Sequence, residues 1–152
     1  MKRLLTLLAA CIAACAATAQ SRIETFTFRS ALLGAEKTCS VYLPAGYDDS
    51  GRSYPVLYLL HGASGYHGDW AEKGNMRQIA DETIAAGTAL PMIVVMPDAS
   101  GTGENYTGDR MGYFDVPGWP YERFFFEEFV PAVERRYRIC GDKARRAISG
   151  LS

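Results

Sequence analysis

The last residues of the chain resemble the first half of a nucleophile turn. Gly150, Leu151 and Ser152 match the start of a Gly-x-Ser-x-Gly pattern. In that pattern a strand passes through a strained turn into a helix, and the residues beside the serine are small because the two backbones approach closely. A Gly two places before a Ser is common by chance. The triplet is more significant here because it directly follows an expected strand at residues 146–149. Ser152 is therefore a candidate nucleophile for acyl transfer.

Acyl transfer also requires hydrogen-bond donors for the charge that develops on the carbonyl oxygen. The segment LLHGASG, residues 59–65, ends an apolar run and begins a Gly-rich stretch. In enzymes that carry the Gly-x-Ser-x-Gly turn, the loop after an earlier buried strand donates one backbone N–H to the oxyanion, and the residue after the nucleophile donates the other. Gly62 leaves room for an acyl group, which makes the N–H of Ala63 the expected oxyanion donor.

Other residues with catalytic side chains are given structural interpretations. His67 and Asp69 lie close in sequence, but two ligands are fewer than zinc requires, so we expect a solvated loop histidine and no metal site. Glu122, Glu127 and Glu128 have helical spacing and are expected mostly on a solvated face rather than as a glycosidase pair. Four loop aromatics either stack on a ligand or pack within the loops: Trp70, Tyr106, Tyr113 and Trp119.

The hydropathy pattern predicts the elements that position these groups. Alternation predicts a hairpin of two strands, one beginning near residue 22 and the other at residues 37–43, and continuous apolar runs predict buried strands at 56–60 and 92–96. A helix is expected to begin at an Asn75 cap with Gln78 three residues later and to stop at Gly87. A second helix is expected from 121 to about 137, kinked by Pro131. The order strand, helix, strand, helix, strand indicates a parallel α/β sheet.

The first nineteen residues have the pattern of a signal peptide. Lys2 and Arg3 precede an apolar run that ends in Ala-Thr-Ala at 17–19, and the run is shorter than a membrane span usually requires. We expect residues 1–19 to be removed and 20–152 to form part of one domain that is secreted or periplasmic, with no stable membrane span. The alternative is a lipoprotein anchored through Cys15 or Cys11.

The composition argues against several functions. Sixteen Lys and Arg residues balance seventeen Asp and Glu residues, without the basic stripe that nucleic-acid binding requires. The segment GTGENY at 101–106 lacks the last glycine of a dinucleotide fingerprint, so no cofactor is expected. Cys39 and Cys140 remain after the signal peptide, and a bridge between them is possible but is not indicated by the sequence.

Four blocks together resemble the esterase D type family, which includes feruloyl and acetyl-xylan esterases, S-formylglutathione hydrolases, siderophore esterases and mycolyltransferases. The blocks occur in the order and spacing of the family and cover most of the chain after residue 22; they are residues 54–62, 92–98, 127–131 and 146–152. The resemblance implies an α/β-hydrolase fold, with a mostly parallel central sheet and helices on both faces. It also implies a serine triad with Ser152 as the nucleophile, and gives His61 a loop-positioning role rather than a catalytic one.

The resemblance places the triad acid and histidine later than Ser152, and so after Asp98 as well. We therefore expect an N-terminal portion of the domain, truncated after the nucleophile strand and inactive by itself. Export favours a carboxylic ester hydrolase acting on small-molecule or polysaccharide esters, of feruloyl or acetyl-xylan esterase type. The alternatives are a siderophore esterase, an S-formylglutathione hydrolase-like enzyme or an acyltransferase of the same fold, and, from another class, a non-catalytic carbohydrate-binding relative.

Overall fold

The computed structural model describes residues 20–101 and 112–151. The expected signal peptide, Tyr106 and Ser152 therefore lie outside the described residues. Within the described ranges, no helix combines the length and the apolar character needed to cross a bilayer.

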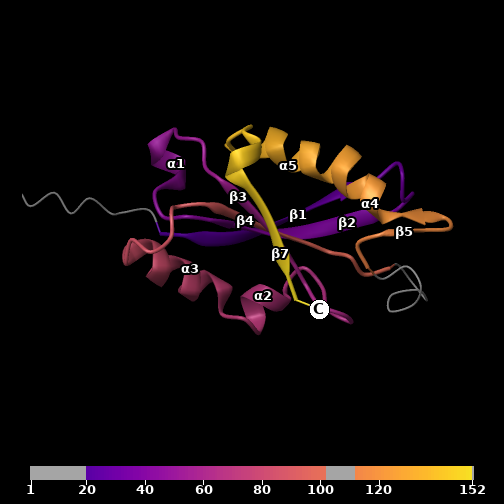
Figure 1. The fold of residues 1–152 in the computed structure, drawn as a ribbon, viewed down its shortest axis with the longest axis horizontal. Helices are drawn as coiled ribbons and strands as arrows, with labels where there is room; N and C mark the ends of the chain where they lie inside the picture. Colours follow the sequence, from indigo (N-terminus) through magenta and orange to yellow (C-terminus); the bar gives the residue numbers. More distant parts are fainter. Residues whose placement is uncertain (1–19, 102–111, 152) are drawn as a thin grey trace, which may run out of the picture.

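Five strands form one mixed sheet in the order β1-β2-β4-β3-β7 (Figure 1). The strands are β1 (Arg22–Arg29), β2 (Glu36–Leu43), β3 (Val56–Leu60), β4 (Ile93–Pro97) and β7 (Arg146–Gly150). The expected hairpin is the antiparallel pair β1–β2, and β2 also pairs antiparallel with β4. The pairs β4–β3 and β3–β7 are parallel, which brings the carboxyl ends of these three strands to the same edge of the sheet.

Helices cover both faces of this sheet, as expected for an α/β fold (Figure 1). One face carries α2 (Asp69–Glu72) and α3 (Met76–Ala85), and the other carries α4 (Tyr121–Phe124), a π-helical segment (Phe125–Phe129) and α5 (Val130–Arg136). The shorter elements are α1 (Tyr47–Ser50), the small hairpin β5 (Asp115–Val116) and β6 (Trp119–Pro120), and a 3₁₀ turn (Lys143–Arg145).

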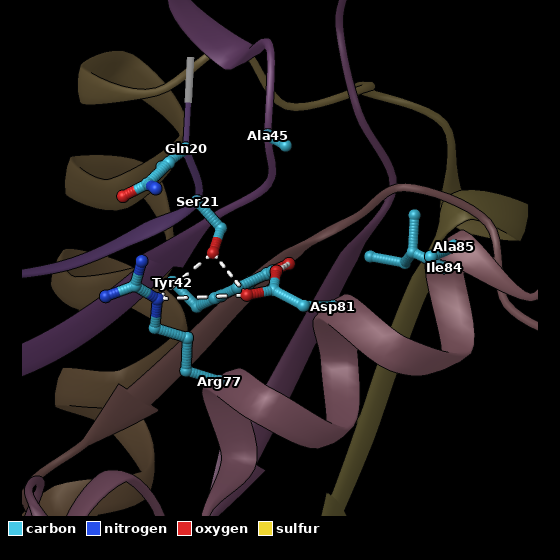
Figure 2. A pocket seen from close by; sticks show the side chains of 8 residues that line it. All are labelled: Gln20, Ser21, Tyr42, Ala45, Arg77, Asp81, Ile84 and Ala85. Carbon is cyan, nitrogen blue, oxygen red and sulfur yellow. Dashed lines mark hydrogen bonds and ion pairs between the residues drawn. The ribbon is translucent and has the colours of Figure 1, made fainter. Parts of the chain in front are cut away.

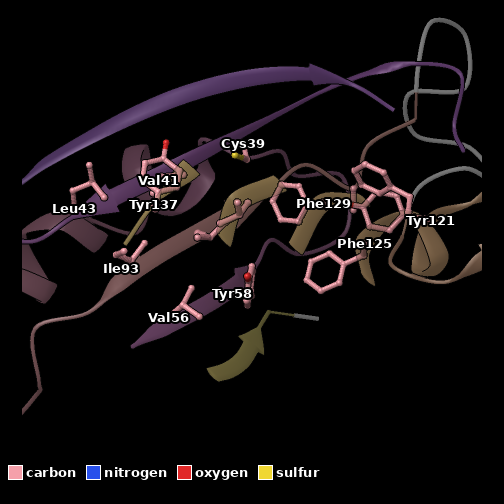
Figure 3. Close-up of a cluster of buried hydrophobic side chains, with 14 of the residues drawn as sticks. Cys39, Val41, Leu43, Val56, Tyr58, Ile93, Tyr121, Phe125, Phe129 and Tyr137 are labelled. Carbon is pink, nitrogen blue, oxygen red and sulfur yellow. The ribbon is translucent and has the colours of Figure 1, made fainter. Parts of the chain in front are cut away.

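Alternation along the buried strands supplies a separate core to each helix layer. Ile93 and Val95 of β4 belong to the cluster packed by Phe125 and Phe129, whereas Val94 belongs to the cluster on the α3 side. Figure 3 shows the first cluster between the sheet and the π-helical segment. Side chains of successive strand residues point to opposite faces, so a continuous apolar run is required where both faces are covered.

Helix α3 has the expected end but not the expected cap. Gly87 has a φ of 71°, and the Thr88 N–H donates to the Thr83 carbonyl across it, which closes the helix with a left-handed residue. The capping prediction was wrong. Asn75 itself has a φ of 48° and makes no side-chain cap, and the Gln78 amide instead donates to Glu82 one turn later.

A π-helical turn lies close to Pro131, where the sequence predicts a kink. The segment Phe125–Phe129 ends two residues before Pro131, and the Val130 N–H donates to the Phe125 carbonyl five residues back. Proline lacks an N–H, and in a regular helix its ring meets the carbonyl four residues earlier. A wider turn at this point relieves that contact and keeps Phe125 and Phe129 on the buried side.

Candidate active site

Three chain segments and the residue after β7 line a cavity of about 280 Å³ at the carboxyl edge of the parallel strands. Its lining comes from the segment after β3, the segment after β4, the segment before β5 and the residue after β7. These residues are His61, Gly62, Ala63, Ala99, Gly112, Tyr113, Phe114 and Leu151. Residues nearly 90 positions apart in sequence therefore meet in one place because the sheet order makes their strands neighbours.

The direction of the Ala63 amide follows from the contacts of the preceding carbonyl. The Gly62 oxygen accepts hydrogen bonds from His61 Nδ1 at 2.8 Å and from the Gly65 N–H at 3.1 Å. The described chain contains no cis peptide bond, and in a trans peptide the C=O and the following N–H point in opposite directions. The Ala63 N–H consequently points away from these contacts. It has no hydrogen-bond partner among the described residues, and Ala63 lines the cavity.

His61 is a structural residue in this arrangement. Its ring is buried, and Nε2 accepts a hydrogen bond from the Ala99 N–H at 2.9 Å. Since Nε2 is the acceptor, the ring proton is on Nδ1, which donates to the Gly62 carbonyl. Both ring nitrogens are occupied by the backbone, so His61 ties the segment after β3 to the segment after β4.

Gly150 permits the close approach of β7 to β3 that the motif requires. A Cβ at this position would lie 2.8 Å from Leu60 Cβ and 2.9 Å from the Leu60 carbonyl oxygen. The pairing continues one residue further, where the Leu151 N–H donates to the same carbonyl at 3.2 Å. Leu151 then reaches the cavity wall, and Ser152 is the next residue in the sequence.

Asp98 belongs to the loop after β4 and is engaged there. Its carboxylate accepts hydrogen bonds from the N–H and hydroxyl of Ser100, and Lys37 Nζ lies 3.7 Å away. The Asp98 backbone carbonyl accepts a hydrogen bond from the Tyr121 hydroxyl at 2.8 Å. The carboxylate therefore fixes the loop that presents Ala99 to His61.

His67 is not the solvated residue that we expected. A hydrogen bond of 2.8 Å joins its Nδ1 to the Ser40 hydroxyl, and burial lowers the pKa of the ring. Asp69 forms an ion pair with Lys73 instead. In the two described ranges, no three His, Cys, Asp or Glu side chains gather where a metal ion could be held. Cys39 and Cys140 are both free thiols.

One of the three helical glutamates also departs from the expected solvated face. Glu122 and Glu127 are exposed, and Glu127 pairs with Arg123. Glu128 instead accepts hydrogen bonds from the N–H groups of Ala31 and Leu32, each at 3.1 Å, and from the Ser30 hydroxyl. Helical periodicity could not reveal this contact because its partners lie almost 100 residues away.

Of the described loop aromatics, two make packing or backbone contacts and one lines the cavity. Trp119 is buried in the core, and Trp70 donates its indole N–H to the Leu60 carbonyl. Tyr113 lines the cavity and donates to the His61 carbonyl at 3.2 Å. Phe114, which the sequence analysis did not single out, also lines the cavity, with 61% of its surface exposed. The sequence feature that could have identified Phe114 is its position directly after Tyr113, one of the loop aromatics considered above.

A second cavity, of about 480 Å³, lies between α3 and the start of β1, away from these loops. Figure 2 shows its polar side chains turned toward one another. Ser21 donates to Asp81 at 2.6 Å, Tyr42 donates to Asp81 at 2.7 Å, and Arg77 donates to Ser21 at 3.1 Å. These groups bind each other, and none of them points to a particular ligand.

The fold and the cavity at the carboxyl ends of β3, β4 and β7 define an α/β-hydrolase. Comparison with protein families agrees, because the model of the family described as "Putative esterase" matches residues 30–152. The chain belongs to this esterase family.

Several individual proteins that resemble this chain are feruloyl or ferulic acid esterases. The chain is 35% identical over 134 residues to the endo-1,4-beta-xylanase/feruloyl esterase of Xylanibacter ruminicola, a match that covers 86% of this chain and 18% of that protein. A solved ferulic acid esterase superposes with a TM-score of 0.81 at 42% identity, over 88% of this chain and 50% of that one. A ferulic acid esterase from Anaeromyces mucronatus, solved in complex with ferulic acid, superposes with a TM-score of 0.72 at 26% identity. That match covers 90% of this chain and 51% of the esterase. The chain thus spans about half the length of these solved relatives.

Proposed function

We propose that the protein is a carboxylic ester hydrolase that forms an acyl intermediate on Ser152. The observation that carries the proposal is the Ala63 N–H, which has no hydrogen-bond partner in the part of the chain that the structure describes; Ala63 lines a cavity that Leu151, the residue before Ser152, also lines. Acyl transfer requires a nucleophile together with a backbone donor that can bind the oxyanion. The family match to residues 30–152 supports the same reaction.

In the proposed reaction, the Ser152 hydroxyl attacks the ester carbonyl and the alcohol leaves, after which water releases the acid. The Ala63 N–H donates to the oxyanion of each tetrahedral intermediate, and the N–H of the residue after Ser152 provides the second donor. Neither His61 nor His67 is assigned as the general base. The ring nitrogens of His61 hold the backbone, and His67 is bonded to Ser40. The histidine and the acid of the triad are assigned to sequence after Ser152.

The cavity favours an aromatic acyl group. Most of its lining is apolar and includes the rings of Tyr113 and Phe114 together with Ala99 and Leu151. Flat rings at these positions offer a surface on which a phenolic acid can stack. The ferulic acid esterases among the relatives support feruloyl esters of plant polysaccharide as the substrate class. The expected signal peptide supports a secreted or periplasmic enzyme, or a lipoprotein if Cys15 or Cys11 is lipidated.

The test is hydrolysis of p-nitrophenyl acetate and methyl ferulate by the protein expressed from the complete gene, beside its Ser152→Ala variant. We expect the Ser152→Ala variant to lose activity by at least about a thousandfold, because the nucleophile is removed. Methyl ferulate should be the better substrate by kcat/KM if the aromatic wall binds the acyl group. Equal background rates in both proteins would instead favour a non-catalytic carbohydrate-binding relative.

A further inference from the structure

Lys37 is a buried cation whose position the proposed reaction does not by itself explain. It is the only Lys or Arg side chain that is buried in the described part of the chain, with 4% of its surface exposed. Its ammonium donates to the Ser100 carbonyl at 2.6 Å and lies 3.7 Å from the Asp98 carboxylate. Taking an ammonium out of water is costly even when it is paired, so stability alone is a weak reason for a lysine here.

The ammonium completes the anchoring of the loop after β4. Asp98 is held through its carboxylate by Ser100 and through its carbonyl by Tyr121, and Lys37 binds both the Ser100 carbonyl and the Asp98 charge. Between these two fixed residues lies Ala99, which is fully buried. The contacts of Asp98 and Ser100 hold the backbone on either side of Ala99, and the Ala99 N–H donates to His61 Nε2 at 2.9 Å.

From Ala99 the contacts lead directly to the candidate oxyanion donor. The hydrogen bond to Nε2 places the ring proton of His61 on Nδ1, which donates to the Gly62 carbonyl. Because the peptide that follows is trans, the Ala63 N–H points away from the partners of the Gly62 carbonyl, and Ala63 itself lines the cavity. If the loop after β4 shifted, His61 would lose the bond that selects its tautomer, and the peptide between Gly62 and Ala63 would lose one of its two restraints.

We propose that Lys37 is a positioning residue for the oxyanion donor, acting through Ser100, Ala99 and His61 on the Ala63 amide. This inference rests on the proposed function, because it assigns a role within the same site. Lys37 touches neither the cavity nor the reacting atoms and is not a catalytic residue. Burial lowers the pKa of Lys37, and the negative charge of Asp98 opposes that shift, which favours an ammonium that donates to the loop.

The experiment compares Lys37→Met with the parent, both expressed from the complete gene, on p-nitrophenyl acetate and methyl ferulate. Met has a similar shape but donates no hydrogen bond. Removal of a whole oxyanion donor costs about a hundred- to a thousandfold in kcat, so misorientation of one should cost about ten- to a hundredfold. The loss should be in kcat, with KM changed less than about twofold, and by the same factor for both esters because both develop the same oxyanion.

A second readout is independent of activity. In protein carrying ¹⁵N-labelled histidine, the His61 Nδ1–H tautomer should dominate in the parent and give way to a mixture in Lys37→Met. Lys143→Met, at an exposed position in the 3₁₀ turn, is the matched control and should change neither readout. Parental kcat together with the parental tautomer in Lys37→Met would overturn the proposal.

A double variant separates positioning from charge balance. Lys37→Met leaves the Asp98 carboxylate without its cation and lowers stability, whereas Lys37→Met with Asp98→Asn removes both charges. The double variant should regain melting temperature but keep the low kcat, since the bond to the Ser100 carbonyl is still missing. Full recovery of kcat would overturn the proposal. If the parent itself lacks Ser152-dependent hydrolysis, the proposed function fails, and the His61 tautomer alone decides whether Lys37 sets this loop.

Discussion

Gly65 occupies a crowded position in the turn after β3. A Cβ there would lie 2.5 Å from Asp69 Oδ2 and 3.0 Å from both the Gly62 carbonyl oxygen and His61 Nδ1. The Gly65 N–H is also one of the two donors to the Gly62 carbonyl. A methyl group at this position would crowd the Gly62 carbonyl and the His61 ring, the two groups whose hydrogen bond helps to orient the Ala63 amide. Gly65 is thereby linked to the candidate site without contact to a substrate.

Gly65→Ala is expected to lower kcat for ester hydrolysis at least about tenfold, because the oxyanion donor would turn away from its position. Overpacking of this kind should also cost about 1–3 kcal/mol in the free energy of unfolding. Steady-state kinetics and thermal melting of the complete gene product measure both effects. Gly141→Ala, where a Cβ meets nothing within 4 Å, is the control. Equal kinetics in the two variants would contradict the assignment of Ala63.

At the scale of elements, the π-helical segment binds the connection between β1 and β2. Glu128 receives the N–H groups of Ala31 and Leu32 and the hydroxyl of Ser30, which in turn accepts the Leu33 N–H. These N–H groups belong to a turn rather than to a strand, so the sheet offers them no carbonyl partner. One carboxylate thus attaches the edge hairpin to the helix layer that covers it.

Glu128→Ala should lower the free energy of unfolding by about 1–3 kcal/mol, because several donors, one of them the half-buried Leu32 N–H, lose their acceptor. Glu127→Ala, one residue earlier, removes only an exposed ion pair with Arg123. It should change the free energy of unfolding by less than about 1 kcal/mol. Urea unfolding of the two variants beside the parent gives the comparison. Similar losses from both substitutions would mean that the turn finds other partners.

At the scale of the whole molecule, the sheet order brings distant ionisable groups around the loops after β3 and β4. His67 bonds to Ser40 on β2. Burial lowers its pKa, and the nearby charges act against one another: Asp98 and Glu72 raise the pKa, whereas His61 and Lys37 lower it. The folded protein therefore binds a proton at His67 less readily than the unfolded chain does, so protonation of this ring favours unfolding.

Stability should consequently fall as the pH drops below about 6.5, the ordinary histidine pKa, until the lower pKa of folded His67 is passed. His67→Asn keeps a polar partner for Ser40 but does not titrate in this range. Its free energy of unfolding, measured by urea denaturation from pH 7.5 to 5, should decline less steeply than that of the parent. Parallel curves would show that His67 does not contribute to the acid sensitivity.

Local sequence patterns predicted elements better than they predicted their ends and contacts. The continuous run at Val56–Leu60 and the stop at Gly87 were assigned correctly, because burial on two faces and a positive φ each restrict the residue types that fit. The Asn75 cap prediction was wrong, because Asn75 has a left-handed backbone and makes no side-chain cap, and Gln78 bonds to Glu82 rather than back to the helix start. Sequence pattern alone identifies Lys37 only as a strand residue and Glu128 only as a helix-surface residue. Their contacts could not be predicted because their partners come from remote segments.

The sequence by itself determined the α/β class, the positions of the main strands and the esterase resemblance, because these depend on periodicity and on motifs whose residues are neighbours. Only the tertiary structure decided which groups surround the candidate oxyanion donor. The turn of the Ala63 amide depends on His61, the tautomer of His61 depends on Ala99, and Ala99 is held through Lys37 and Asp98. Apart from the bond between the neighbours His61 and Gly62, each of these contacts joins segments that the order of strands in the sheet brings together, and hydrophobic periodicity carries no information about that order.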